Sequence, residues 1–291
     1  MNTILEVKGL EKGYKDSEFC LKDVSFSIPS GAIMGFVGEN GSGKTTTIGC
    51  ILNTLIKDGG SVKIFGKEMT GDAIDIRNDI GVVYDTNCFP VALTAMEISS
   101  AMRHIYSNWD NDLFKEYLKK FKLTEKKAVK TFSRGMTMKL AIAVALSHRP
   151  KFLVLDEATA GLDPIVRDDI LDVLLDFVQD ENNSILLSSH ITSDLEKVAD
   201  YITFIHEGRI VFSESKDNLI YNYGIMRCKS AQFAEIDKED ILAYRKHDYQ
   251  IDVLVSDRKS AEKKYRDIII DNVSIEEVMV MLVKGDKFEN E

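Results

Sequence analysis

Apolar runs of strand length recur along the chain up to about residue 215, and polar segments with helix or turn signals separate them. The runs 32–37, 80–84 and 152–155 are apolar at nearly every position, and a fourth, 184–189, is apolar between serines. Runs of this kind are typical of strands buried on both faces of a sheet that helices cover. The pattern therefore predicts an α/β fold with an open central sheet.

Two regions of the same part of the chain show other patterns. Residues 2–30 contain two stretches of alternating apolar and polar positions, which predict a small β-region. Residues 94–147 are expected to be mostly helical, as a helical subdomain at about 86–147. One apolar helix face in it is more typical of core than of a ligand site, and Trp109 is expected to pack; the face comprises Leu113, Phe114, Tyr117, Leu118 and Phe121.

The pattern changes after about residue 215, where short strand signals alternate with helical ones. The expected strands are 225–228, 251–255 and 268–270, and the expected helices are 238–245, 260–265 and 275–283. Ser274 and Glu277 form a capping box for the last helix. This stretch contains no catalytic constellation, so residues 216–291 are expected to form a small α+β accessory domain.

Composition and charge narrow the class of protein. The chain has 291 residues, 44% hydrophobic content and 29% charged content, which suits a globular fold of one large domain or two unequal ones. A net charge of −10 makes nucleic acid an unexpected partner. Four scattered cysteines indicate reduced thiols in a cytoplasmic protein, and no apolar run approaches the length of a membrane span, so we expect no crossing of a bilayer.

A phosphate-binding loop is predicted directly after the first buried strand, where residues 38–45 read Gly-Glu-Asn-Gly-Ser-Gly-Lys-Thr. The glycines let backbone N–H groups turn inward, Lys44 supplies a charge for the β- and γ-phosphates, and Thr45 offers a hydroxyl to Mg²⁺ at the start of a helix. The predicted nucleotide-binding residues here are Gly38, Glu39, Asn40, Gly41, Ser42, Gly43, Lys44, Thr45 and Thr46.

Polar residues at other positions suggest further parts of this site. Tyr14 lies in a turn, where its ring could stack on a nucleobase or cover a sheet edge. Ser133 is expected to cap the next helix and make an anion-binding end. Asp156 and Glu157 directly follow the strand 152–155 and suit metal-assisted phosphate chemistry, with a helix-capping pair as the alternative. His190 follows the strand 184–189, at the sheet edge where ligands of α/β proteins gather.

In this order the residues resemble the nucleotide-binding subunit of ATP-binding-cassette (ABC) transporters. The resemblance covers about residues 1–215 and implies a P-loop NTPase cassette with a RecA-like core sheet, an N-terminal β-region and a helical subdomain. The matches are Tyr14 to the adenine-stacking aromatic, 38–45 to Walker A, 132–136 to the signature, Asp156 and Glu157 to the Walker B aspartate and catalytic glutamate, 161–163 to the D-loop, and His190 to the switch histidine.

Two positions depart from the family pattern. The signature commonly reads Leu-Ser-Gly-Gly-Gln, but here Arg134 and Met136 replace the first glycine and the glutamine, while Ser133 and Gly135 remain. Asp85 stands where the Q-loop glutamine is usual, and its carboxylate can still coordinate Mg²⁺ or orient water. The signature sequence at 132–136 and the accessory domain expected at 216–291 look similar to those of bacterial exporter cassettes encoded as separate subunits. Some of these exporters handle peptides or antibiotics.

The resemblance implies ATP and Mg²⁺ as cofactors and a head-to-tail dimer with a second cassette, identical or related. It also implies an integral membrane permease, so the chain would be peripheral on the inner face of the cell membrane. The implied roles are phosphate binding by Lys44, Mg²⁺ binding by Thr45 and Asp156, polarisation of the attacking water by Glu157, contact with the γ-phosphate by His190, and cover of the other chain's ATP by Ser133 and Gly135.

Two other functions stay open at this stage. One is an ABC ATPase that acts on DNA or ribosomes without transport, against which the acidic charge and the single short cassette weigh. The other is a degenerate module that holds ATP without turnover; the catalytic residues argue against it, and the two departures leave it open. The sequence does not indicate the cargo.

Overall fold

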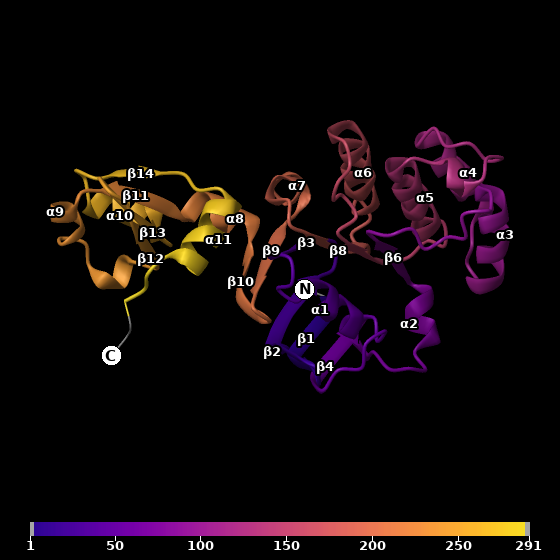
Figure 1. The fold of residues 1–291 in the computed structure, drawn as a ribbon, viewed down its shortest axis with the longest axis horizontal. Helices are drawn as coiled ribbons and strands as arrows, with labels where there is room; N and C mark the ends of the chain where they lie inside the picture. The colour runs from indigo at the N-terminus through magenta and orange to yellow at the C-terminus, as the bar shows by residue number, and fades with distance from the viewer. Residues whose placement is uncertain (1–2, 289–291) are drawn as a thin grey trace. The chain divides into compact units, whose positions relative to one another are not determined.

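The computed structural model describes residues 3–288, which fall into two compact units (Figure 1). One unit is Met1–Ala199 with Ile205–Ile210, and the other is Asp200–Phe204 with Val211–Glu291. The division passes through the hairpin of β9 (Tyr201–His206) and β10 (Arg209–Ser215). The domain boundary expected at residue 215 stays a prediction, and the two units are described separately.

The N-terminal β-region is an antiparallel sheet in the order β2-β1-β4-β5. Its strands are β1 (Thr3–Tyr14), β2 (Ser17–Pro29), β4 (Gly59–Ile64) and β5 (Lys67–Glu68). Alternate residues of β1 and β2 are buried, including Leu5, Val7, Val24 and Ile28. The alternating pattern in the sequence therefore identified this sheet, which a later strand, β4, extends.

The central sheet has the order β10-β9-β3-β8-β7-β6 and confirms the predicted α/β core. Its parallel strands are β3 (Ile33–Val37), β6 (Ile80–Tyr84), β7 (Phe152–Asp156) and β8 (Ser184–Ser189). The registers pair Val37 with Ser189, Asp156 with Ser188 and Tyr84 with Asp156. The segments that follow these strands therefore leave from one edge of the sheet.

The helices of this unit lie between its strands in chain order, as the labels in Figure 1 show. They are α1 (Lys44–Ile51), α2 (Ile74–Asn78), α3 (Ala95–Ile105), α4 (Asn111–Lys120), a 3₁₀ turn at Val129–Thr131, α5 (Arg134–Leu146), α6 (Pro164–Phe177) and α7 (Thr192–Val198). Side-chain caps mark where several begin, because Thr94 with Glu97 forms a capping box on α3 and Asp110 caps α4.

The apolar face predicted on α4 belongs to the core of the helical region. Phe114 and Leu118 are buried, and the rings of Trp109 and Phe114 lie 5.4 Å apart between centroids. The indole N–H of Trp109 donates a hydrogen bond of 3.1 Å to Ser99 Oγ, which satisfies its polar edge. The prediction that these aromatic residues pack in the core is confirmed.

The second unit has a four-stranded antiparallel sheet in the order β12-β13-β11-β14. Its elements are α8 (Lys216–Asn222), β11 (Gly224–Cys228), α9 (Ser230–Phe233), a 3₁₀ turn at Lys238–Asp240, β12 (Ala243–Lys246), β13 (Ile251–Val255), α10 (Arg258–Lys264), β14 (Ile269–Asp271) and α11 (Ile275–Lys284). The capping box of Ser274 and Glu277 on α11 is present as predicted.

The helix expected over 238–245 is wrong. Only Lys238–Asp240 turns, and Ala243–Lys246 forms β12 against β13, with Ala243 opposite Leu254. Ala243 is fully buried and the Leu242 N–H donates to the Leu254 carbonyl at 2.9 Å. Pairing with a distant strand therefore overrides the local helical spacing.

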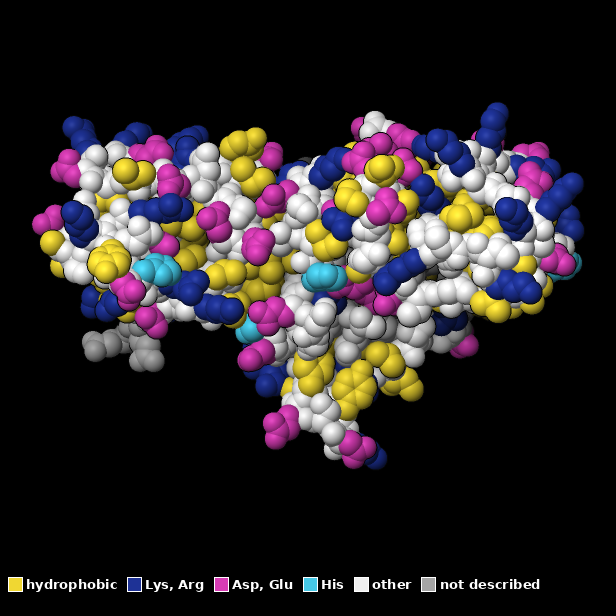
Figure 2. All heavy atoms as spheres, turned by 45° about the horizontal axis from the view of Figure 1, so that its top comes forward, with side chains coloured by type: hydrophobic (Ala, Val, Ile, Leu, Met, Phe, Trp, Pro, Cys, Tyr) yellow, Lys and Arg dark blue, Asp and Glu magenta, His cyan; other side chains and the backbone are white. Residues whose placement is uncertain are grey.

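No helix in the described residues has both the length and the apolar content needed to cross a membrane. Figure 2 shows basic and acidic side chains interspersed over the face that it draws.

Replacing Phe114 by alanine is expected to lower the free energy of unfolding by about 3–5 kcal/mol, because a fully buried ring leaves a cavity. Urea titration followed by the fluorescence of Trp109, the chain's single tryptophan, measures this change. Ile105→Ala on α3 is the control, since that side chain is 64% exposed and should change stability by about 0.5 kcal/mol or less. Equal effects of the two substitutions would contradict the packing described here.

Candidate nucleotide site

The P-loop joins β3 to α1 and depends on its glycines. Gly41 and Gly43 have φ angles of 82° and 115°, which side chains strongly disfavour. A Cβ on Gly38 would collide with the Ile205 carbonyl and lie 2.5 Å from Ser42 Oγ. No side chain caps α1, so the N–H groups at its start remain available to an anion.

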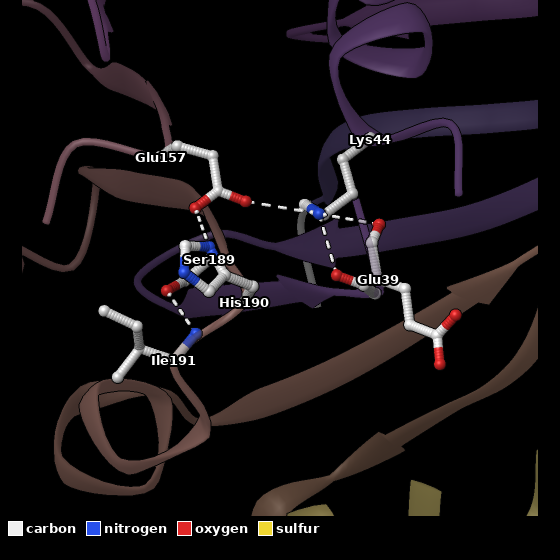
Figure 3. Close-up of polar contacts among 7 residues, drawn as sticks. Glu39, Lys44, Glu157, Ser189, His190 and Ile191 are labelled. Atoms are coloured by element: carbon white, nitrogen blue, oxygen red, sulfur yellow. Dashed lines mark hydrogen bonds and ion pairs between the residues drawn. The ribbon is translucent and has the colours of Figure 1, made fainter. Parts of the chain in front are cut away.

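Lys44 lies at the centre of this site, and only 5% of it is exposed. Its Nζ donates hydrogen bonds to the Gly38 and Glu39 carbonyls at 2.7 and 3.1 Å. The same Nζ lies 3.2 Å from Glu157 Oε1, as Figure 3 shows. The P-loop thus holds the ammonium group in place, and a carboxylate from the end of β7 balances its charge.

Glu157 and His190 are brought together although they follow different strands. His190 Nδ1 lies 2.6 Å from Glu157 Oε2, so one carboxylate oxygen faces the histidine and the other faces Lys44 (Figure 3). Glu157 has a left-handed φ of 55°, a conformation that costs energy for a residue with a side chain. This turn directs Glu157 toward Lys44 at the end of an otherwise regular buried strand.

Asp156 is 6% exposed, and its Oδ1 has no hydrogen-bond partner among the described residues. Burial raises the pKa of this carboxyl, while the Thr45 and Ser188 hydroxyls beside it act in the opposite direction. A buried carboxylate oxygen without a partner, next to a hydroxyl, fits a hard divalent cation such as Mg²⁺. The described residues contain no cluster of three His, Cys, Asp or Glu side chains that could hold a metal, so phosphate and water oxygens would complete the coordination.

Ser188 was not identified from the sequence as a site residue. It lies in β8 opposite Asp156 and is fully buried, and its hydroxyl acts to lower the pKa of the Asp156 carboxyl. The available signal was a pair of serines at the end of the apolar strand 184–189. A hydroxyl next to a metal-binding carboxylate can orient that carboxylate by donating a hydrogen bond to it.

Tyr14 ends β1 beside the start of α1. Its hydroxyl lies 3.4 Å from Thr46 Oγ1, its ring is within 5.6 Å of Lys12 Nζ, and the residue is 41% exposed. The ring therefore lies next to the P-loop helix with part of its surface open. This position suits the predicted contact with a nucleobase.

The signature residues form a separate group at the start of α5. Ser133 caps the helix, since its Oγ accepts a hydrogen bond of 3.2 Å from the Met136 N–H. Gly135 lies against α6, where a Cβ would come within 3.1 Å of Val166. Within residues 3–288 no hydrogen bond or ion pair joins Ser133 or Gly135 to Lys44, Asp156, Glu157 or His190. The residues predicted to bind anions thus form two separate groups within the described chain.

Asp85 follows β6 at the same sheet edge as Asp156, because its neighbour Tyr84 pairs with Asp156 in register. Its carboxylate makes no hydrogen bond or ion pair with any residue between 3 and 288. The negative charge of Asp85 contributes to the raised pKa of Asp156. The expectation that Asp85 helps to bind Mg²⁺ stays a prediction.

Comparison with known proteins identifies the family. The family described as ABC transporter matches residues 21–160. The bacitracin transport ATP-binding protein BcrA of Bacillus licheniformis is 34% identical over 221 residues, covering 75% of this chain and 72% of the relative. The lantibiotic transport ATP-binding protein SrtF of Streptococcus pyogenes is 32% identical over 216 residues, covering 74% and 92%.

A solved structure titled as the ATP-binding subunit of an ABC transporter is also similar, with a TM-score of 0.68 and 27% identity over 74% of this chain and 91% of that one. The chain belongs to the ABC transporter ATP-binding proteins. It is an ATP-binding and ATP-hydrolysing subunit that powers a transporter, and the predicted cassette fold is confirmed.

Because the pKa of Asp156 is raised in the folded protein, the buried charge is expected to lower the free energy of unfolding as the pH rises. Burial holds the folded pKa above the ordinary 3.8, so the unfolded carboxyl loses its proton first as the pH rises. The unmutated protein therefore loses stability between 3.8 and the raised value, whereas Asp156→Asn avoids this loss. With a chelator present, the variant is expected to unfold at a higher urea concentration at neutral pH.

Urea titrations at several pH values between about 4 and 7 measure this difference, which should grow as the pH rises. The control is Asp112→Asn, whose side chain is 92% exposed and should show no such trend. A destabilised Asp156→Asn protein at neutral pH would show that the carboxylate is stabilised by its surroundings after all.

Proposed function

We propose that this chain hydrolyses Mg²⁺–ATP in a head-to-tail dimer of cassettes and so drives a membrane permease that exports peptide antibiotics or similar amphipathic compounds. The observation that carries the proposal is the convergence of Lys44, Glu157 and His190 on one point beside the P-loop. The chain would then act on the inner face of the cell membrane, where its permease partner lies.

Each group in this arrangement has a chemical role in the proposal. Lys44 and the N–H groups at the start of α1 hold the β- and γ-phosphates. When the phosphates bind, the Lys44 ammonium group leaves Glu157 and contacts the phosphates instead. Thr45 and Asp156 hold Mg²⁺; this coordination does not require Asp85, the third candidate ligand predicted from the sequence. Mg²⁺ supplies charge neutralisation for the phosphates when it is bound.

Glu157 is then released to accept a hydrogen bond from the attacking water, and its contact with His190 sets the orientation of its carboxylate. His190, whose side chain is 44% exposed, then contacts the γ-phosphate in this proposal. Tyr14 stacks on the adenine. The γ-phosphate still lacks hydrogen-bond donors on its open side, and Ser133 and the N–H groups at the start of α5 of a second cassette can supply them.

The dimer follows from the separation of the two anion-binding elements in one chain. A P-loop alone leaves the γ-phosphate open to water, and Ser133 and Gly135 make no described hydrogen bond with Lys44, Glu157 or His190 of their own chain. A second copy or a related cassette can present these groups instead. ATP then joins the two subunits, and hydrolysis releases them.

The cargo assignment rests on the relatives. BcrA is named for bacitracin transport and SrtF for lantibiotic transport, and both align along about three quarters of this chain. Cargo contacts would lie in the permease, so the cassette residues do not select among compounds of this class.

Replacing Glu157 by glutamine is expected to abolish turnover and to leave an ATP-dependent dimer, because the amide keeps the size of the side chain but cannot polarise water. Gel filtration with and without ATP–Mg²⁺, beside phosphate-release rates, measures both effects. Glu125→Gln, at an exposed position, is the control and should hydrolyse ATP at the unmutated rate. We expect a loss of at least about 100-fold in kcat for Glu157→Gln.

The same variant tests transport in cells. Cells that produce the chain with its permease should tolerate bacitracin or a lantibiotic better than cells with Glu157→Gln. Equal tolerance with normal ATPase activity would contradict the cargo. An unmutated chain without turnover beside its permease would favour the degenerate binding module instead.

A further inference from the structure

A cavity of about 280 Å³ lies between the start of α5 and the segment that follows β6. Apolar side chains form part of its wall, among them Phe132 and Met138. It also has one acidic and one basic side chain, Asp85 and Arg134, in its lining. Neither of these makes a hydrogen bond or ion pair through its side chain with another residue between 3 and 288.

The position of Arg134 is set by its contact with Gly161. A Cβ on Gly161 would lie 3.0 Å from Nη1 and 3.2 Å from Cζ of Arg134, so the guanidinium rests against the bare backbone of that glycine. Gly161 has a φ of 66°, which further favours the absence of a side chain there. Arg134 is the first residue of α5, and it lies between Ser133 and Gly135.

The position of Asp85 is set by the sheet. It follows β6 directly, and β6 pairs in parallel with β7, which ends at Asp156. Asp85 therefore lies at the sheet edge beside the cavity, and Arg134 is the basic residue in the cavity lining.

We propose that Asp85 and Arg134 form an ion pair across this cavity when ATP–Mg²⁺ is bound, and that the pair positions Ser133 and Gly135 for the second cassette. The inference rests on the proposed function, whose composite site requires these two residues to be presented correctly. Both side chains line the same cavity, and a planar guanidinium suits two-point contact with a carboxylate.

Asp85 and Arg134 are therefore positioning residues. Arg134 acts on α5, since it is the residue between the two that face the nucleotide, and Asp85 connects it to the sheet edge that holds Asp156. The Asp85 carboxylate therefore pairs with the Arg134 guanidinium and is not a ligand of Mg²⁺.

The test is a double-mutant cycle in the Glu157→Gln protein with saturating ATP–Mg²⁺, read by thermal unfolding. Asp85→Asn and Arg134→Gln should each lower Tm by about 2 °C, and the double variant by about 2 °C rather than the sum, because the second change has no pair left to break. The charge-exchanged variant Asp85→Lys with Arg134→Glu should be more stable than Asp85→Lys or Arg134→Glu alone. Arg103→Gln, an exposed arginine on α3, is the matched control and should add independently to Asp85→Asn.

A second readout separates positioning from general stability. The ATP concentration for half-maximal dimerisation should rise about 5-fold in each single variant and return toward the parent value in the charge-exchanged protein, while the Mg²⁺ concentration needed for dimerisation stays at the parent value. If Arg134 instead contacts the partner's phosphate, its loss will add to that of Asp85 and the exchanged protein will be the weakest. If Asp85 binds Mg²⁺, only its variants will need more Mg²⁺, and either result overturns the pair.

Absence of any dimer in the Glu157→Gln parent would count against the proposed function, whereas the double-mutant cycle in Tm would still test the Asp85–Arg134 ion pair. Additive Tm changes both with and without ATP–Mg²⁺ would refute the ion pair. The conservative variants Asp85→Glu and Arg134→Lys guard against loss of folding, since both keep their charge and should retain at least half of the coupling.

Discussion

The ammonium group of Lys44 lies almost buried between two P-loop carbonyls and the Glu157 carboxylate. A buried charge must be compensated, and here the backbone supplies two acceptors while a second strand supplies the opposite charge. These contacts fix the end of β7 relative to the P-loop. The proposed phosphate-binding lysine and the proposed catalytic carboxylate are thus in contact in the absence of a nucleotide.

The central sheet makes this arrangement possible because its parallel strands end at one edge. Asp156 and Glu157 are neighbours in sequence but lie in different environments. Asp156 is the last residue of a buried strand, where its carboxylate lacks a full set of partners, whereas the left-handed turn at Glu157 directs its side chain to Lys44 and His190. One residue is suited to a metal ion and the next to a water molecule.

Motifs that are contiguous in sequence were predictable, because the glycines of the P-loop, the buried strands and the Ser274–Glu277 capping box encode their own local geometry. Contacts between distant segments were not. The sequence placed Glu157 and His190 near the same edge but could not pair them with each other or with Lys44. Ser188 behind Asp156 and the β12 strand were missed for the same reason, since each depends on a partner strand elsewhere in the chain.

The most direct test of the central role of Lys44 is calorimetry of ATP–Mg²⁺ binding to the unmutated chain and to Lys44→Met. The variant keeps most of the side-chain volume and removes the charge, so it should bind ATP about 10- to 100-fold more weakly. Lys127→Met, at an exposed position, should bind with unchanged affinity. Equal affinities of Lys44→Met and the unmutated chain would show that the buried ammonium group does not hold the phosphates.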